Sequence, residues 1–170
     1  MPRNFELKAR VPSRPAAIAR ARECGAEFSD TLLQIDTYFH VTSGRLKMRE
    51  QYARAAELIH YFREENSMER WSDYQRIPIA DPSALKSALR GALGILAIVE
   101  KERLLFMYKG ARIHIDEVKS LGAFLEFEVP ANGSELPEAL MRELRMIFRI
   151  VEQDLEKGSY SDLILVKSSS

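Results

Sequence analysis

The chain has 170 residues, of which 46% are hydrophobic and 29% are charged. This length and balance are typical of one globular domain with a substantial core. Lys plus Arg and Asp plus Glu both total 25, so the formal net charge is zero. Because a general nucleic-acid binder carries a basic excess, we expect no nucleic-acid partner.

A single cysteine, Cys24, excludes an intramolecular disulfide. The N-terminus has no apolar stretch of the signal-peptide type, and no apolar run approaches membrane-spanning length. We therefore expect a cytoplasmic protein without a membrane partner. The sequence leaves open whether it is a monomer or a homodimer.

The first half of the chain predicts several strands and two helices. A strand at residues 3–11 alternates charged and apolar side chains, and a helix follows with Ser13 as N-cap, Pro15 in its first turn and Gly25 after its end. Further strand-like runs lie at residues 32–41, 45–51, 57–64 and 70–79. Asp81 then caps a helix predicted at residues 82–93.

The second half predicts three more strands, at residues 97–108, 111–118 and 123–129. Apolar residues at helical spacing indicate a helix over residues 136–152. The segment Tyr160–Val166 suggests a short strand, and we expect residues 168–170 to form a disordered tail. Residues 1–167 would then form a single domain.

About eight strands, mostly joined as hairpins, and about three helices predict an α+β fold with a largely antiparallel sheet. Charged residues occupy one face of nearly every strand. An open sheet would place that face in water, whereas a sheet closed into a barrel would place it in a lumen. The alternation by itself does not choose between these two arrangements.

Like charges sit two residues apart on several predicted strands, at positions 47 and 49, 101 and 103, and 126 and 128. On a solvated sheet face, opposite charges usually interleave across strands. A same-face pair of like charges is better tolerated when a ligand of opposite charge or a metal fills the space. From spacing alone, a ligand site and a solvated face are about equally favoured.

The residue types fit a metal and a polyphosphate. Carboxylates such as Glu6, Asp116, Glu126 and Glu128 are natural ligands of Mg²⁺ and Mn²⁺. Arg offers a planar fork to a phosphate, and Lys offers a point charge. His114 lies within the same constellation, and we expect it to pack between strands or to donate or accept a hydrogen bond.

At these residues the chain resembles a known family. The run Asn4-Phe5-Glu6-Leu7-Lys8 resembles the Glu-x-Glu-x-Lys signature of the CYTH superfamily, the triphosphate tunnel metalloenzymes, which include class IV adenylyl cyclases and thiamine triphosphatases. The similarity continues in order through residues 44–49, 72–74, 99–103 and 114–128, and it ends near residues 159–163. The subgroup that it resembles most is the CyaB-like group.

The resemblance implies a closed barrel of eight antiparallel strands with peripheral helices. It implies Mg²⁺ or Mn²⁺ held by Glu6, Asp116, Glu126 and Glu128. It further implies phosphate binding by Lys8, Lys47, Arg49, Arg63, Lys101, Arg103 and Arg112, with catalytic roles for Lys8, Arg49 and Arg112. The expected substrate is a nucleoside, thiamine or inorganic triphosphate, which the protein would hydrolyse or cyclise.

The chain departs from the family signature at its first acid, where it has Asn4. An amide can offer one neutral oxygen to a metal, but it brings no charge and cannot act as a base. This difference favours an alternative, a non-catalytic nucleotide- or polyphosphate-binding module, without affecting the prediction of triphosphate binding.

Overall fold

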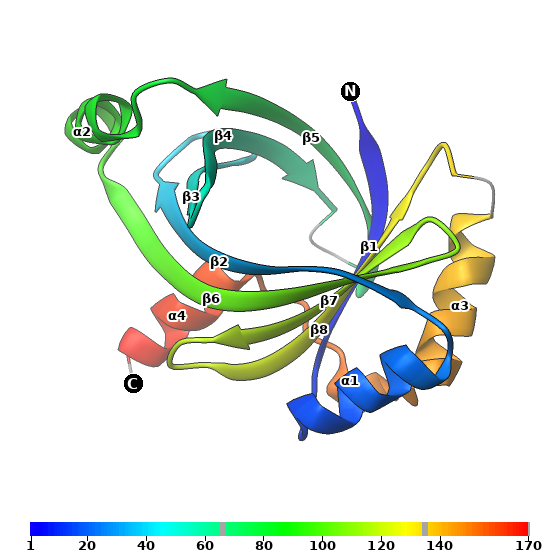
Figure 1. Ribbon diagram of the computed structural model, residues 1–170. Helices are drawn as coiled ribbons and strands as arrows, with labels where there is room; N and C mark the ends of the chain where they lie inside the picture. The colour runs from blue at the N-terminus through cyan, green and yellow to red at the C-terminus, as the bar shows by residue number, and fades with distance from the viewer. Residues whose placement is uncertain (65–66, 134–135, 170) are drawn as a thin grey trace.

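Eight antiparallel strands form a closed barrel in the computed structural model, which describes residues 1–64, 67–133 and 136–169 (Figure 1). The strands are β1 (Arg3–Arg10), β2 (Glu27–Phe39), β3 (Arg45–Gln51), β4 (Arg54–Arg63), β5 (Glu69–Ile79), β6 (Ile95–Tyr108), β7 (Ala111–Val118) and β8 (Gly122–Pro130). Around the barrel they follow the order β1-β5-β4-β3-β2-β6-β7-β8. The closed alternative is therefore confirmed, and the predicted α+β class with it.

The barrel closes where β1 pairs with β8, so segments from the two halves of the chain become neighbours. In this register Glu6 lies opposite Glu128, and Lys8 lies opposite Glu126. On its other side β1 pairs with β5, where Glu6 lies opposite Arg70. Closure therefore brings the first-strand signature next to the acids of β8.

Alternation along the strands separates a polar lumen from an apolar outer face. On β1, Phe5 and Leu7 are buried outside the barrel in the main hydrophobic cluster, whereas Glu6 and Lys8 line the lumen. Successive strand residues point to opposite faces, so the same division continues along β7 and β8. The outer-face cluster also takes in Ile113, Ile115, Leu125, Phe127 and Val129.

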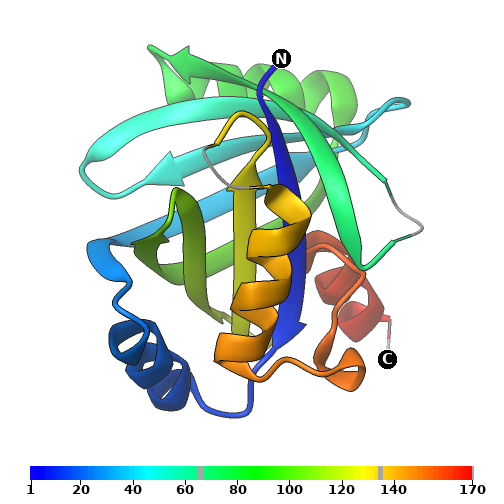
Figure 2. The same cartoon turned by 90° about the vertical axis from the view of Figure 1, so that its right-hand side faces the viewer.

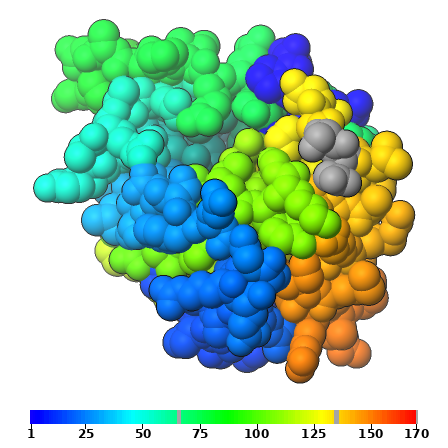
Figure 3. Space-filling model, turned by 45° about the vertical axis from the view of Figure 1, so that its right-hand side comes forward, coloured from blue at the N-terminus to red at the C-terminus, as the bar shows by residue number. Residues whose placement is uncertain are grey.

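Two helices cover this apolar face, α1 (Arg14–Glu23) and α3 (Pro137–Phe148). Figure 2 shows α3 lying across β8 and β1, and Figure 3 shows α1 and α3 side by side on the surface. The buried residues of α3 are Pro137, Leu140, Met141, Leu144 and Phe148, which have the expected helical spacing. This helix is shorter than predicted, because Arg149 adopts a left-handed conformation (φ 55°) that ends it.

The C-terminal segment is a helix, α4 (Tyr160–Ser168), so the predicted strand at Tyr160–Val166 is wrong. The Ser159 hydroxyl accepts a hydrogen bond from the Asp162 amide, and the Asp162 carboxylate accepts one from the Ser159 amide. This reciprocal cap starts a helix despite the β-favouring side chains that follow. The expected disordered tail overlaps this helix at Ser168, and Ser170 lies outside the described residues.

The remaining predicted elements are present, although β2 begins at Glu27 rather than at residue 32, and β4 begins at Arg54 rather than at residue 57. The helix α2 (Pro82–Leu93) begins after Asp81, whose carboxylate accepts a bond from the Ala84 amide at 3.0 Å. In the turn between β2 and β3, Gly44 has a φ of 67°, and an added Cβ would lie 2.8 Å from the Tyr61 carbonyl oxygen. In the part of the chain that the structure describes, no helix has both the length and the apolar character needed to cross a membrane.

Candidate functional site

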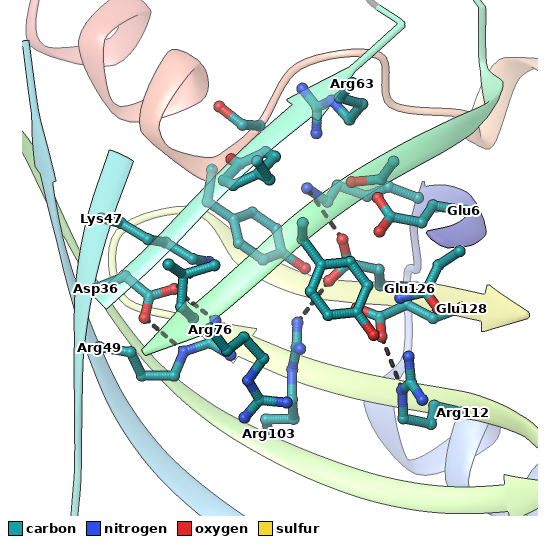
Figure 4. A pocket seen from close by; sticks show the side chains of 18 of the residues that line it. Glu6, Asp36, Lys47, Arg49, Arg63, Arg76, Arg103, Arg112, Glu126 and Glu128 are labelled. Atoms are coloured by element: carbon teal, nitrogen blue, oxygen red, sulfur yellow. Dashed lines mark hydrogen bonds and ion pairs between the residues drawn. The ribbon is translucent and has the colours of Figure 1, made fainter. Parts of the chain in front are cut away.

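The lumen contains a cavity of about 130 Å³. One buried water needs roughly 10–15 Å³, so this space can hold a ligand of many atoms. The cavity is lined by all seven predicted phosphate-binding residues and by three of the four predicted metal ligands, Glu6, Glu126 and Glu128. Figure 4 shows Asp36, Lys47 and Arg49 on one side, Glu6, Glu126 and Glu128 on the other, and Arg103 between them.

At the basic end of the lumen, three cations share one buried carboxylate, Asp36 of β2. Arg49 donates two hydrogen bonds to it, each at 2.7 Å, and Lys47 Nζ donates one at 2.9 Å. Lys101 Nζ donates another at 2.8 Å. Burial alone would raise the pKa of Asp36, but Arg49, Lys101 and Lys47 hold it well below its usual range.

In the middle of the lumen, Arg103 bridges two acids. Its guanidinium donates two bonds to Asp116, each at 2.7 Å, and one to Glu126 at 2.5 Å. The Tyr160 hydroxyl also donates to Asp116, at 2.7 Å. Asp116 therefore lies behind Arg103, fully buried and away from the cavity wall, so a cation in the cavity would reach it only if Arg103 moved.

At the acidic end, carboxylates crowd together. Burial, followed by the charges of Glu128 and Glu126, raises the pKa of Glu6 to about 8. The positive charges of Arg63 and Lys8 lower the pKa of Glu6, but they do not offset these effects. Glu128 is paired with Arg112, whose Nε lies 2.9 Å from Oε2.

Lys8 connects the acidic end with α4. Its Nζ lies 3.7 Å from Glu126 Oε1 and 3.9 Å from the centroid of the Tyr160 ring, a cation–π distance. Burial lowers the pKa of Lys8 to about 8, and burial likewise lowers the pKa of Lys101 to about 7. Both lysines can therefore lose a proton near neutral pH, and a bound polyanion would favour their protonated forms.

The first turn of α4 closes against the barrel and places Tyr160 in the lumen wall. Arg45, at the start of β3, donates to the Ser159 hydroxyl and to the Asp162 carboxylate, both at 2.9 Å. The Tyr160 ring packs edge-on against Phe124 with centroids 5.1 Å apart. These contacts tie the C-terminal helix to the site.

His114 projects inward from β7 and is buried behind the acids of β8. Its Nδ1 lies 3.7 Å from Glu128 Oε1 and 4.0 Å from Glu126 Oε2, and it has no hydrogen-bond partner within the described ranges. Burial, followed by the charge of Arg103, lowers the pKa of His114 to about 4. The ring is therefore neutral at pH 7, and the hydrogen bond that its position suggested is not made by Nδ1.

The donor set at the acidic end fits a divalent cation. Glu6, Glu126 and Glu128 supply the oxygen ligands that Mg²⁺ and Mn²⁺ prefer. The raised pKa of Glu6 reflects burial and the repulsion of Glu128 and Glu126, and a cation would relieve that repulsion. Asn4 lines the same cavity and is buried, so its amide oxygen is the only donor at the signature's first position.

Sequence reasoning missed Asp36 and Tyr160, which organise the basic end and the middle of the lumen. Asp36 shares an inward face with Tyr38, two residues further along β2, and this spacing was the available signal. For Tyr160, the signal was the Ser159–Asp162 cap, which would have placed the tyrosine in the first turn of a helix.

Charge is unevenly balanced in the lumen. Among the described residues, eight Lys and Arg side chains line the cavity, against the four carboxylates of Glu6, Asp36, Glu126 and Glu128. A focused excess of positive charge in a low-dielectric cavity attracts a polyanion. The neutral net charge of the whole chain conceals this local excess.

Comparisons with known proteins agree with this architecture. The structure is similar to that of the PH1012 protein from Pyrococcus horikoshii OT3, with 21% identity, coverage of 94% of this chain and 98% of that chain, and a TM-score of 0.80. It is similar to a putative adenylate cyclase from Vibrio parahaemolyticus, with 20% identity, coverage of 95% and 97%, and a TM-score of 0.76.

A third similar structure is a putative adenylyl cyclase from Hippeastrum, described as revealing a dominant triphosphatase activity. It shows 17% identity, coverage of 98% of this chain and 96% of that chain, and a TM-score of 0.64. At these identities, the three likenesses show a shared fold. No curated protein matches the chain. The CYTH domain family matches residues 2–160, nearly the whole chain, and the chain therefore belongs to that family.

Proposed function

We propose that this protein binds a triphosphate with Mg²⁺ or Mn²⁺ in its lumen and hydrolyses or cyclises it. The observation that supports this most directly is the charge of the lumen, where eight cationic side chains face four carboxylates among the residues that the structure describes. Arg103 separates the basic end from the acidic end. One end suits phosphate oxygens, and the other suits the cation that accompanies them.

Each group of lumen residues has a distinct proposed role. Lys47, Arg49 and Lys101 grip phosphates at the basic end, with Arg63, Arg103, Arg112 and Lys8 around the rest of the wall. Glu6, Glu126 and Glu128 hold the cation, which supplies charge neutralisation at the phosphate oxygens. Asp116 positions Arg103 through its two 2.7 Å bonds.

Two reactions fit this arrangement, and they differ in the nucleophile. In hydrolysis, water attacks the terminal phosphorus, the bond from that phosphorus to the bridging oxygen breaks, the diphosphate is the leaving group, and orthophosphate is formed. In cyclisation, the ribose 3′-hydroxyl attacks the α-phosphorus and pyrophosphate leaves. Hydrolysis is the preferred proposal, because the chain has no evident adenine-specific motif and the similar Hippeastrum protein is described as having dominant triphosphatase activity.

A non-catalytic triphosphate-binding module is the second candidate, and Asn4 is the observation that favours it. This residue occupies the cavity wall on the same strand face as Glu6, where the family signature has an acid. An amide adds no negative charge for a second cation and cannot accept a proton from a nucleophile.

A product assay distinguishes these candidates. Purified protein is given ATP, inorganic triphosphate or thiamine triphosphate, each with Mg²⁺, with Mn²⁺ or with a chelator. Orthophosphate release would support hydrolysis, and cyclic AMP with pyrophosphate would support cyclisation. Tight binding without turnover would select the binding module, and the absence of both binding and turnover for all three substrates would refute the proposal.

A further inference from the structure

Three potential ligand atoms converge at the acidic end of the lumen. They belong to His114 of β7 and to Glu126 and Glu128 of β8, and all lie within 4.8 Å of one another. His114 pairs with Glu126 in the β7–β8 register, and its Nδ1 lies 4.0 Å from Glu126 and 3.7 Å from Glu128. The convergence is fixed by two adjacent strands of a closed barrel.

The buried nitrogen lacks the partner that its environment requires. His114 is 4% exposed, and across the described residues Nδ1 has no hydrogen-bond partner. A buried polar atom without a partner costs about 1–3 kcal/mol, so native proteins seldom keep one without a function or a bound group. In the tautomer with hydrogen on Nε2, Nδ1 directs a lone pair toward the space between the two carboxylates.

Two neighbouring arginines hold the carboxylates of Glu126 and Glu128 in place. Arg112 holds Oε2 of Glu128, which leaves Oε1 turned toward His114 Nδ1. Arg103 donates to Oε2 of Glu126, the same oxygen that lies 4.0 Å from His114 Nδ1. Groups that fix the orientation of a ligand in this way commonly surround metal sites in proteins.

The spacing also suits one cation. Ligand atoms bound about 2.1 Å from a common ion can lie up to about 4.2 Å apart. Both distances from His114 Nδ1, 3.7 Å and 4.0 Å, fall below that limit. All three ligand atoms lie within 4.8 Å of one another, so small side-chain adjustments would bring them to one ion.

We propose that His114 is a nitrogen ligand of the divalent cation, through Nδ1, together with Glu126 and Glu128. The inference rests on the proposed function, because the cation is the one that the triphosphate reaction requires. An imidazole ligand suits transition metals better than Mg²⁺, which prefers oxygen. The site therefore favours Mn²⁺, Co²⁺ or Zn²⁺ over Mg²⁺.

Pulsed electron paramagnetic resonance of the Mn²⁺-loaded protein tests this assignment without using activity. Free Mn²⁺ is first titrated with the full chain, with and without inorganic triphosphate, to measure binding. The bound Mn²⁺ is then examined for coupling to ¹⁴N, and the experiment is repeated with ¹⁵N-labelled histidine. We expect a ¹⁴N coupling that is replaced by a ¹⁵N coupling in the labelled protein.

His114→Asn keeps a polar group near the Nδ1 position but offers no imidazole, and exposed His40→Asn is the matched control. His114→Asn should abolish the nitrogen coupling and weaken Mn²⁺ binding about 10-fold or more relative to Mg²⁺. His40→Asn should leave both unchanged.

The outcomes separate the two proposals. Mn²⁺ that binds to the wild-type protein without nitrogen coupling would overturn the role of His114 and leave the proposed metal dependence standing. Mn²⁺ that fails to bind, with or without triphosphate, would overturn both. The first outcome needs only the wild-type protein, so a His114 variant that fails to fold does not prevent the test.

Discussion

Replacing Asp36 by Asn tests whether one buried carboxylate organises the basic end of the lumen. The substitution keeps the size of the side chain and removes its charge. Asp36 now accepts hydrogen bonds from Lys47, Arg49 and Lys101 at 2.7 to 2.9 Å. An Asn amide would accept at one oxygen only, and its NH₂ group would face donors.

The structure sets the expected size of the effect. Asp36 is 1% exposed, and removing one partner from a buried ion pair costs about 3–5 kcal/mol. For a chain of this length, that loss lowers Tm by roughly 6–20 °C. Because the pKa of Asp36 is held well below its usual range, its contribution to stability is present above about pH 4 and is lost as the pH falls further. Variant and wild type should therefore converge in stability only in acid.

Bound triphosphate should offset the loss of stability that the Asp36→Asn substitution causes. The three cations that Asp36 holds are also proposed phosphate ligands, so the carboxylate competes with the substrate for them. Asp36→Asn should therefore show a larger rise in Tm on addition of inorganic triphosphate than the wild type shows. Thermal unfolding with and without the ligand, at fixed ionic strength and without metal, measures both effects.

Asp73→Asn is the matched control, because Asp73 is paired with Arg3 at 3.5 Å but both side chains are well exposed. An exposed pair contributes about 1 kcal/mol or less. Equal Tm values for the two variants would refute the claim that Asp36 neutralises buried cations. An equal triphosphate-induced shift in Asp36→Asn and wild type would refute the competition.

Three further changes probe the phosphate grip, the metal ligands and the core. Burial lowers the pKa of Lys101 to about 7, so this side chain loses its charge as the pH rises, and triphosphate affinity should fall between about pH 7 and pH 9. Lys101→Ala should weaken triphosphate binding and reduce the dependence of affinity on pH. Exposed Lys119→Ala, the control, should leave that dependence as in the wild type. Glu126→Gln should lower metal-dependent triphosphate binding or turnover, and unchanged values of both would remove Glu126 from the metal site. Leu144→Ala should lower the free energy of unfolding, measured by urea denaturation, by about 2–5 kcal/mol, because the side chain of this α3 residue is fully buried. Exposed Met146→Ala should change the unfolding free energy by about 0.5 kcal/mol or less, and equal losses would contradict the assigned core.

Much of the barrel wall follows from alternation alone. On β1, β7 and β8, apolar and charged residues alternate with period two, and the structure places the two sets on opposite faces. Alternation does not predict that the barrel closes, because closure depends on pairing between strands that are distant in the sequence. The register that sets Glu6 opposite Glu128 joins the first strand to the last and has no local signal in either.

Asp36 was missed because the pattern around it points the wrong way. Leu33 and Ile35 alternate with it along β2, and a pattern of this kind predicts that the apolar residues are buried. In the structure Leu33 is 49% exposed and Ile35 is 41% exposed, whereas Asp36 is 1% exposed. The polar face is the buried one, so hydrophobic periodicity alone assigns this strand to the wrong orientation.

The crowding of carboxylates at the acidic end explains why Asn4 can replace the first signature acid without disrupting the site. Burial and the charges of Glu128 and Glu126 already raise the pKa of Glu6 to about 8. Another carboxylate on the same strand face would add to that repulsion unless a second cation were bound. A neutral amide removes this requirement, so under the proposed function the lumen needs only one cation beside the polyanion. The departure that weakens the case for family-type catalysis is thus compatible with the proposed binding of a triphosphate.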